Sequence, residues 1–199
     1  DTLQGGLGDD IYFVNNAATL IAEATGEGND RVASSVSFAL AADDSIEILS
    51  TTGVAGLAAI NLRGNALAQV IIGNAGNNII EGGEGQDTLT GHGGADIFVF
   101  KTNLGGGANF DKITDFDPVN DLFHLDNAVF TGLANGALAA SAFAANLSGL
   151  ATDALDRIIY ETDTGDLFFD VDGTGAAARV RFAQITAGLP LTAADFLVI

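Results

Sequence analysis

The chain has 199 residues, a length that allows one or two domains with a substantial core. Its 26 acidic and 7 basic residues give a net charge of −19, which makes nucleic acid and anionic membranes poor partners and bound cations favourable ones. The absence of cysteine excludes disulfide bonds and thiolate metal sites. No apolar run reaches the roughly 18 residues that a membrane-spanning helix needs, so we expect no stable membrane insertion.

The chain opens on a nine-residue pattern of glycines, an acid or amide and an apolar residue. Residues 5–13 fit the pattern fully, and residues 25–33 fit it without the first glycine. Residues 1–4 match its last four places, so we expect the chain to be the C-terminal piece of a longer protein with a domain upstream. Residues 35–40 and 45–50 alternate apolar and polar residues and are predicted to be strands that continue the repeat structure without metal.

Three contiguous copies of the pattern follow, at residues 73–81, 82–90 and 91–99, after a degenerate copy at 64–72. Each of the three has glycine at its first and fourth places, Asp or Asn at its sixth and an apolar residue at its eighth. A single Gly/Asn/Asp run could equally be a flexible linker or a hairpin turn. Three copies in register favour a repeat architecture, and this nonapeptide is a known signature of calcium-binding parallel β-structure.

Each unit predicts a six-residue turn followed by a very short strand, so that two units complete a coil of eighteen residues. Turns eighteen residues apart then lie above one another, and their carboxylates and carbonyls form an all-oxygen cage. Such a cage suits calcium better than zinc or copper, while magnesium requires a stricter octahedron. The eighth-place side chains are predicted to point inward as a stack of Tyr12, Val32, Ile71, Ile80, Leu89 and Phe98.

These motifs resemble the repeats-in-toxin (hemolysin-type calcium-binding) family, and in particular its C-terminal β-roll and type I secretion region, as in the serralysin C-terminal domain. The resemblance implies several calcium ions, each held by two turns one coil apart. The earlier turn would give its second and fourth carbonyls and its sixth side chain, and the later turn its first and third carbonyls and its sixth side chain. The implied ligand sets are Asn74, Gly76 and Asn78 with Gly91, Gly93 and Asp96; Asn65, Leu67 and Gln69 with Gly82, Glu84 and Asp87; and Gly6, Gly8 and Asp10 with Thr25, Glu27 and Asp30.

The last of these sets is spaced by twenty residues, which requires a two-residue insertion in that coil. Residues 111–126 resemble the segment that follows the final repeat in the family. By that resemblance Asp115 and Asp121 would close the cage opened by Gly83, Gly85 and Asp87. The alternative is that the two acids cap turns around Pro118.

Beyond residue 126 the sequence predicts a different structure. Residues 136–150 are Ala-rich and predict a short helix capped near Ser141. Residues 157–160 and 167–172 predict a hairpin, and residues 179–182 a further strand. The run at 170–175 resembles the start of a calcium loop but lacks the distal acid of an EF-hand, which favours a tight turn.

The chain ends on an acid followed by four apolar residues. These could form an edge strand of the last sheet. By the family resemblance they would be an uncleaved signal read by the ABC transporter of a type I secretion system. The residues concerned are Asp195, Phe196, Leu197, Val198 and Ile199.

The sequence thus predicts an all-β fold, a right-handed parallel β-roll followed by a β-sandwich-like cap with a short helix. We expect degenerate coils at 1–63, the calcium β-roll at 64–100 and a capping and secretion region at 101–199. The predicted function is a calcium-dependent folding and export module of a protein secreted to the cell exterior or surface. The alternative is a carbohydrate- or surface-binding module. His92 and His124 belong to no catalytic motif, so no enzyme activity is expected.

Overall fold

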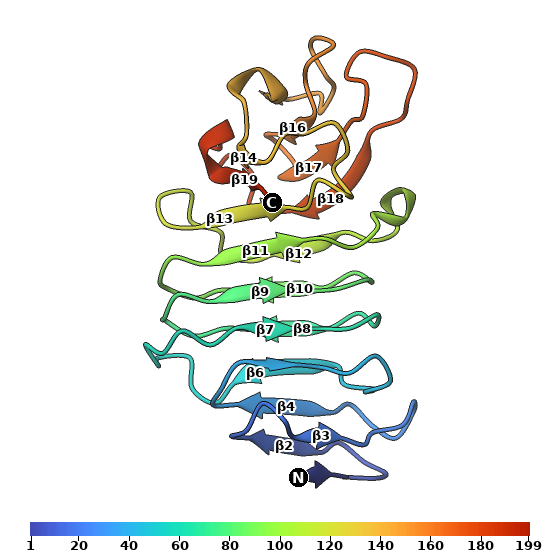
Figure 1. Ribbon diagram of the computed structural model, residues 1–199, viewed down its shortest axis with the longest axis vertical. Helices are drawn as coiled ribbons and strands as arrows, with labels where there is room; N and C mark the ends of the chain where they lie inside the picture. The colour runs from blue at the N-terminus through green and yellow to red at the C-terminus, as the bar shows by residue number, and fades with distance from the viewer.

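The computed structural model describes all 199 residues and is built almost entirely of short strands. Flat coils stack along one axis from the N-terminus, and a broader cap closes the other end (Figure 1). Two sheets run along this axis and face each other across a narrow core. None of the helices has the length and apolar character needed to span a bilayer.

The larger sheet has ten strands. In pairing order they are β15 (Phe143–Asn146), β16 (Ile158–Glu161), β17 (Asp166–Phe169), β18 (Val180–Gln184), β12 (Asp111–Ile113), β10 (Thr88–Thr90), β8 (Val70–Ile72), β6 (Ile48–Thr51), β4 (Arg31–Ser34) and β2 (Ile11–Val14). From β2 to β18 the neighbours pair in parallel, and β17 pairs antiparallel with both β18 and β16.

The facing sheet has seven strands. They are β14 (Gly136–Ala137), β19 (Phe196–Val198), β13 (Leu122–Leu125), β11 (Ile97–Phe100), β9 (Ile79–Glu81), β7 (Leu62–Arg63) and β5 (Phe38–Ala39). A separate parallel pair, β1 (Thr2–Leu3) and β3 (Leu20–Ile21), lies at the N-terminal end. The 3-10 helices are η1 (Gly105–Gly107), η2 (Ala140–Ala142) and η3 (Ala193–Asp195).

The register confirms the predicted coil. Val70 pairs with Thr88, and Ile79 pairs with Ile97, each eighteen residues on. The first coil is longer, because Ile11 pairs with Arg31. The predicted parallel β-roll is therefore correct, including the two-residue insertion near the N-terminus.

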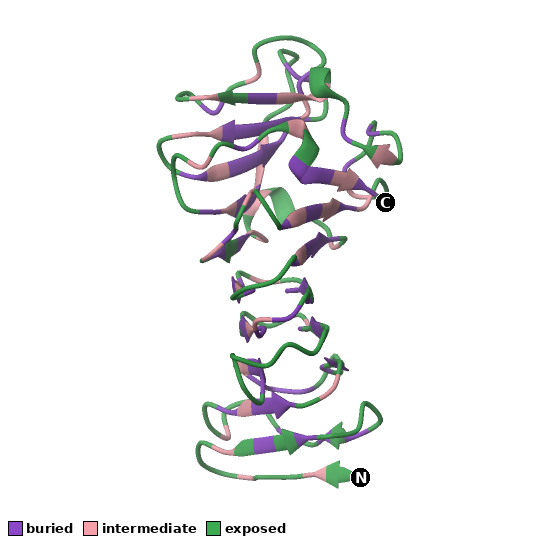
Figure 2. Ribbon diagram, turned by 90° about the vertical axis from the view of Figure 1, so that its left-hand side faces the viewer, coloured by how far each residue is buried: buried purple, intermediate pink, exposed green.

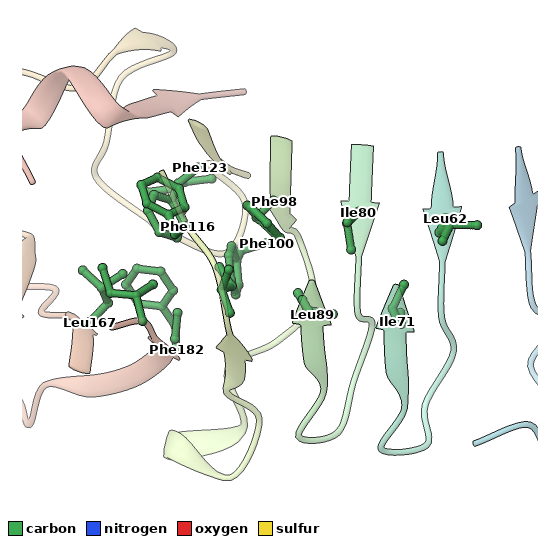
Figure 3. Packing of buried hydrophobic residues seen from close by; sticks show 14 of the residues in the cluster. Leu62, Ile71, Ile80, Leu89, Phe98, Phe100, Phe116, Phe123, Leu167 and Phe182 are labelled. Carbon is green, nitrogen blue, oxygen red and sulfur yellow. The ribbon is translucent and has the colours of Figure 1, made fainter. Parts of the chain in front are cut away.

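The predicted inward stack is confirmed and is divided between the two sheets. Ile71 and Leu89 enter the core from the larger sheet, and Ile80 and Phe98 enter it from the facing sheet (Figure 3). All four are fully buried, and Tyr12 and Val32 are buried further down the roll. Most core side chains of the narrow roll are aliphatic, whereas phenylalanines are more numerous in the core of the wider cap.

Both sheets continue from the roll into the cap. On one side β10 pairs with β12, which pairs with β18, and on the other β11 pairs with β13, which pairs with β19. The strands of the cap are largely buried, whereas most turns of the roll are exposed (Figure 2). The change in sequence near residue 100 is therefore not a break in the sheets, and the roll and the cap share one core.

Two expectations about the C-terminal half were wrong. Residues 136–150 do not form a capped helix: β14 and β15 flank the single turn η2, whose N-cap has no side-chain hydrogen bond. The reason is tertiary, because Phe143–Asn146 pairs with β16 in parallel and sheet pairing overrides local helix propensity. The final strand is also not an edge strand, since β19 lies between β13 and β14. The predicted hairpin of β16 and β17 and the strand β18 are confirmed.

Candidate metal centre

The turns between strands form two columns, one along each edge of the roll. The first turn column leads into the larger sheet and contains residues 4–10, 22–30, 40–47, 64–69, 82–87 and 101–110. The second turn column leads into the facing sheet and contains residues 35–37, 52–61, 73–78, 91–96 and 114–121. In each turn of the three contiguous repeats, the sixth place immediately precedes the next strand, so strand pairing fixes its position.

Side chains at the sixth place connect consecutive turns by a repeated hydrogen bond. The backbone N–H of the sixth residue in one turn donates to a side-chain oxygen of the residue at the same place one coil later. In the second column, Asn78 donates to Asp96 over 2.8 Å and Asp96 donates to Asp121 over 2.9 Å. In the first column the bonds are Asp10 to Asp30 (2.8 Å), Asp30 to Glu47 (2.7 Å), Gln69 to Asp87 (2.6 Å) and Asp87 to Asp111 (3.1 Å).

The second oxygen of three sixth-place carboxylates has no partner in the protein. These atoms are Oδ2 of Asp10, Asp87 and Asp96, and all three are buried from solvent. Asp87 and Asp96 are each only 1% exposed. None of the three residues takes part in an ion pair. A buried carboxylate oxygen without a donor is costly, and a cation is the usual partner where no basic side chain is present.

Glycines leave room beside these oxygens. A β-carbon on Gly91 would overlap Asp96 Oδ2, and one on Gly82 would overlap Asp87 Oδ2 and approach Asp111 Oδ2 to 2.9 Å. Gly83 has a φ of 111° and lies over the Asn65 carbonyl oxygen, where any side chain would collide. The first place of these two turns and the second place of the turn at 82–87 must therefore be glycine to let oxygen atoms from two coils converge, whereas Asn74 and His92 occupy the second place of the other two turns.

A comparison with protein families agrees with this geometry. The model described as RTX calcium-binding nonapeptide repeat (4 copies) matches residues 1–16 and 63–98. The chain is an RTX-type repeat protein. RTX repeats bind calcium, several ions to a domain, and the buried oxygens described above suit that hard cation. No curated protein matches the chain significantly.

The structure brings together the turns of all three implied ligand sets. The turn with Asn74, Gly76 and Asn78 stacks on the turn with Gly91, Gly93 and Asp96, and a β-carbon on Gly94 would meet the Gly76 carbonyl. Gly91 O and Asn78 Oδ1 both lie close to the position of a β-carbon on Gly73. The Asn78 amide nitrogen donates to Ile60 O over 2.7 Å and to Asn74 Oδ1 over 3.2 Å, and Asn78 Oδ1 accepts from the Asn74 N–H over 2.8 Å.

The set with Asn65, Leu67 and Gln69 stacks on Gly82, Glu84 and Asp87 in the same way. Gln69 differs from an acid because both ends of its amide are bound within its own turn. Its Oε1 accepts from the Asn65 N–H over 3.2 Å, and its Nε2 donates to Asn65 Oδ1 over 2.5 Å. Asp87 thus brings the only free carboxylate to the space between these two turns.

The upstream set is also stacked. Gly8 N–H donates to the Glu27 carbonyl over 2.6 Å, and Asn29 N–H donates to Asp9 Oδ1 over 2.9 Å. Asp10 and Asp30 occupy equivalent places, while Gly6 is half-buried and Thr25 is exposed in the two turns. The RTX match covers the first of these turns but not the second, which lies in the unmatched segment.

Asp115 and Asp121 were expected to lie above the turn at 82–87, and this expectation was wrong. They lie above the turn at 91–96: Asp115 accepts from the Gly91 and His92 N–H groups, and Asp121 accepts from Asp96 N–H. Above Gly83, Gly85 and Asp87 the sixth place belongs to Asp111. The loop between β11 and β12, which contains η1, lengthens this coil from eighteen to twenty-four residues, and a strict spacing of eighteen therefore missed Asp111.

A simple sequence signal identifies the missed residues. Each sixth-place acid stands two residues before a buried apolar residue at the start of a strand. Asp111 precedes Ile113 in this way, and Glu47 precedes Leu49. This rule counts residues back from the strand and does not depend on the glycines, so it still holds where the turn is longer.

Burial sets the proton affinity of these acids in the absence of metal. The pKa of Asp96 is raised from 3.8 to about 6, chiefly by burial and also by the negative charges of Asp121 and Asp115, while the hydrogen bond from Asn78 acts in the opposite direction. Burial likewise raises the pKa of Asp87 to about 6. The pKa of Asp111 is raised well above its usual range by burial and by the adjacent Asp87. These groups therefore bind either protons or a cation.

We expect calcium binding to weaken below pH 6. Because the pKa values of Asp87 and Asp96 are raised in the folded chain, their contribution to the stability of the calcium-free fold is fully present below about pH 4 and is lost as the pH rises through about 6. Calcium requires the charged form, so its affinity should fall about tenfold per pH unit below 6 for each proton displaced. Calorimetric titration at pH 5 and pH 7.5, in buffers of different ionisation enthalpy, measures both the affinity and the protons released. Equal affinity at the two pH values would contradict this assignment.

Proposed function

We propose that this calcium-binding β-roll is the folding and export module of a larger type I secreted protein. Its partners would be the ABC transporter complex during export and an upstream domain of the same protein afterwards. The observation that carries the proposal is the set of buried, unpartnered carboxylate oxygens at Asp10, Asp87 and Asp96. These groups make the folded state unfavourable without a cation, so folding follows the calcium concentration.

The charge and the stacked sites explain how calcium controls folding. Where free calcium is scarce, a chain of net charge −19 with 26 glycines stays open and can be threaded through a transporter. Extracellular calcium modules commonly have dissociation constants of about 10⁻⁴–10⁻³ M. Even at one hundred times that constant, a single ion contributes only about 2.7 kcal/mol, so several ions must act together. Each stacked coil stabilises its neighbours, so calcium ions bound in successive coils act cooperatively.

The folded C-terminus supports export before folding. Asp195 Oδ2 accepts from the Thr192 N–H over 2.6 Å and caps η3, and Phe196 and Val198 are buried in the cap. A transporter could read this acid and these apolar side chains only while the chain is unfolded. RTX repeat proteins are typically secreted, and we place this chain at the cell exterior or surface.

We also propose that the chain binds calcium without catalysing a reaction. His92 lies exposed in a turn where its backbone N–H donates to Asp115, and His124 lies in β13. A carbohydrate-binding role receives less support, because it would favour an exposed aromatic platform. Tyr12 and Tyr160 are both buried.

Deletion of residues 195–199 is expected to abolish secretion from a host that carries a type I transporter. The control is Phe123→Ala, because Phe123 stacks on Phe196 at 4.8 Å and its loss weakens the same cap while leaving the terminus intact. Secretion is measured as the fraction of protein in the medium. Retained secretion of the deletion variant would remove the terminus from the signal, and equal loss in both variants would show that the cap, not the terminal sequence, is required.

A further inference from the structure

Three carboxylates converge in the longer coil near the N-terminus, and one of them lies outside the repeat pattern. Oxygen atoms of Asp10, Glu23 and Asp30 all lie within 4.8 Å of one another. Asp10 and Asp30 are sixth-place residues, whereas Glu23 comes from the stretch between β3 and the second turn, two residues before that repeat begins. Both Glu23 and Asp30 lie in the segment that the RTX repeat does not match.

The Glu23 side chain is buried and incompletely bonded. It is only 5% exposed, and its Oε1 has no partner, as is true of Asp10 Oδ2 beside it. Its Oε2 accepts a hydrogen bond from the Tyr12 hydroxyl, which in turn accepts from the Gly5 N–H over 2.8 Å. Tyr12 therefore holds Glu23 toward the two aspartates, although like charges repel.

Nothing basic offsets this concentration of charge. The ion pairs of the chain join Arg63 and Lys101 to Glu81 and Arg181 to Asp166, all outside this coil. Arg31 follows Asp30 directly but donates to the Ser50 hydroxyl over 2.9 Å. Two buried oxygens without donors and three carboxylates without a counter-ion leave protonation or a bound cation as the means of stabilisation, and the cation is the one that keeps all three carboxylates charged.

We propose that Asp10, Glu23 and Asp30 form a calcium site of a second type, with three carboxylates and with Tyr12 as the residue that positions Glu23. The proposal rests on the calcium binding described above and adds a site with a different donor set. The turn pairs of Asn78 with Asp96 and of Gln69 with Asp87 each combine one sixth-place carboxylate with one amide. Affinity and preference for highly charged ions rise with the number of charged ligands, so this site should bind calcium more tightly than those two pairs and should favour trivalent ions.

The two-residue insertion provides the extra ligand. Asp10 and Asp30 are twenty residues apart, whereas Gln69 and Asp87 are eighteen apart. The longer coil gives the chain between β3 and β4 the length to turn Glu23 inward. The insertion is therefore a functional feature and not a lapse in the repeat.

Terbium provides a direct test, because Tyr12 is positioned to transfer excitation to an ion held by Glu23. The chain has no tryptophan, and its other tyrosine, Tyr160, lies in the cap with its hydroxyl accepting from Leu189 N–H over 3.0 Å. Terbium added to the full chain should give tyrosine-sensitised emission at low occupancy, and calcium should compete with it. Glu23→Gln should weaken this binding by about tenfold or more. Asp163→Asn, the same loss of charge at an exposed side chain in the turn between β16 and β17, should leave it unaltered.

Two further measurements decide the remaining cases. Tyr12→Phe should remove the emission while the number of bound calcium ions, counted by equilibrium dialysis, stays the same. Persistent emission in Tyr12→Phe, or unchanged terbium affinity in Glu23→Gln, would overturn the proposal. Calcium-induced folding of the unaltered chain, followed by circular dichroism, is recorded in parallel. If calcium folds the unaltered chain but Glu23→Gln binds terbium with unchanged affinity, only this site is rejected. If calcium does not fold the unaltered chain, the proposed folding function is rejected instead.

Discussion

Removal of calcium with excess EDTA should abolish most of the β-sheet circular dichroism of this chain in one cooperative step. The three unpartnered carboxylate oxygens at Asp10, Asp87 and Asp96 would then remain buried without any counter-charge. The penalty for an uncompensated buried charge is several kcal/mol per ion, and three such penalties together exceed the small net free energy of unfolding of a domain of this size. A metal site of this kind does not exist in the open chain, so loss of metal and loss of fold are one event.

The cap should unfold together with the roll. The pairings of β10 with β12 and of β11 with β13 join the two parts, and the buried phenylalanines of the cap continue the aliphatic core of the roll. Added calcium should restore the spectrum. An equal concentration of magnesium should not, because magnesium gives up its water reluctantly and needs a regular octahedron. A β-sheet spectrum and a thermal midpoint that both survive strong chelation would show that the fold does not depend on calcium.

Much of the roll could be predicted because its periodicity is local. The glycine places and the apolar eighth place recur every nine residues, and these determine the turns, the strands and the buried positions of Ile71, Ile80 and Leu89. The sixth-place acids were found for the same reason wherever the coil kept its length. The prediction of stacked turns therefore needed only a periodic pattern and the rise of a strand.

The remainder depends on contacts between distant segments. Asp111 was missed because η1 and its loop lengthen one coil, and Glu23 because it precedes its repeat and turns inward only in the folded coil. The Ala-rich run before β15 predicts a helix locally, yet β16 pairs with Phe143–Asn146. The interior place of β19 could not be seen either, since β13 and β14 become its neighbours only after folding.

Replacement of Asp96 by alanine should have the largest effect of any single substitution in the roll. Asp96 connects two successive turn pairs, because its Oδ1 accepts from Asn78 N–H and its own N–H donates to Asp121. Its free Oδ2 lies beside Gly91, at the centre of the second turn column. Loss of both adjacent ions would remove about 5 kcal/mol of calcium-dependent stabilisation at one hundred times the dissociation constant. The calcium concentration at the folding midpoint, followed by circular dichroism, should rise more than in any variant of an exposed acid.

Two companion variants separate charge from hydrogen bonding. Asp163→Ala removes the same charge from an exposed hairpin turn and should leave the folding midpoint unchanged. Asp96→Asn can keep the bond from Asn78 N–H but replaces one carboxylate oxygen by an amide and removes the charge. If the carboxylate is a ligand, Asp96→Asn should resemble Asp96→Ala in the number of calcium ions bound. If Asp96→Asn instead folds at the same calcium concentration as the unaltered chain, Asp96 stabilises the turns through its hydrogen bond alone, and the second column holds its ions through carbonyl oxygens.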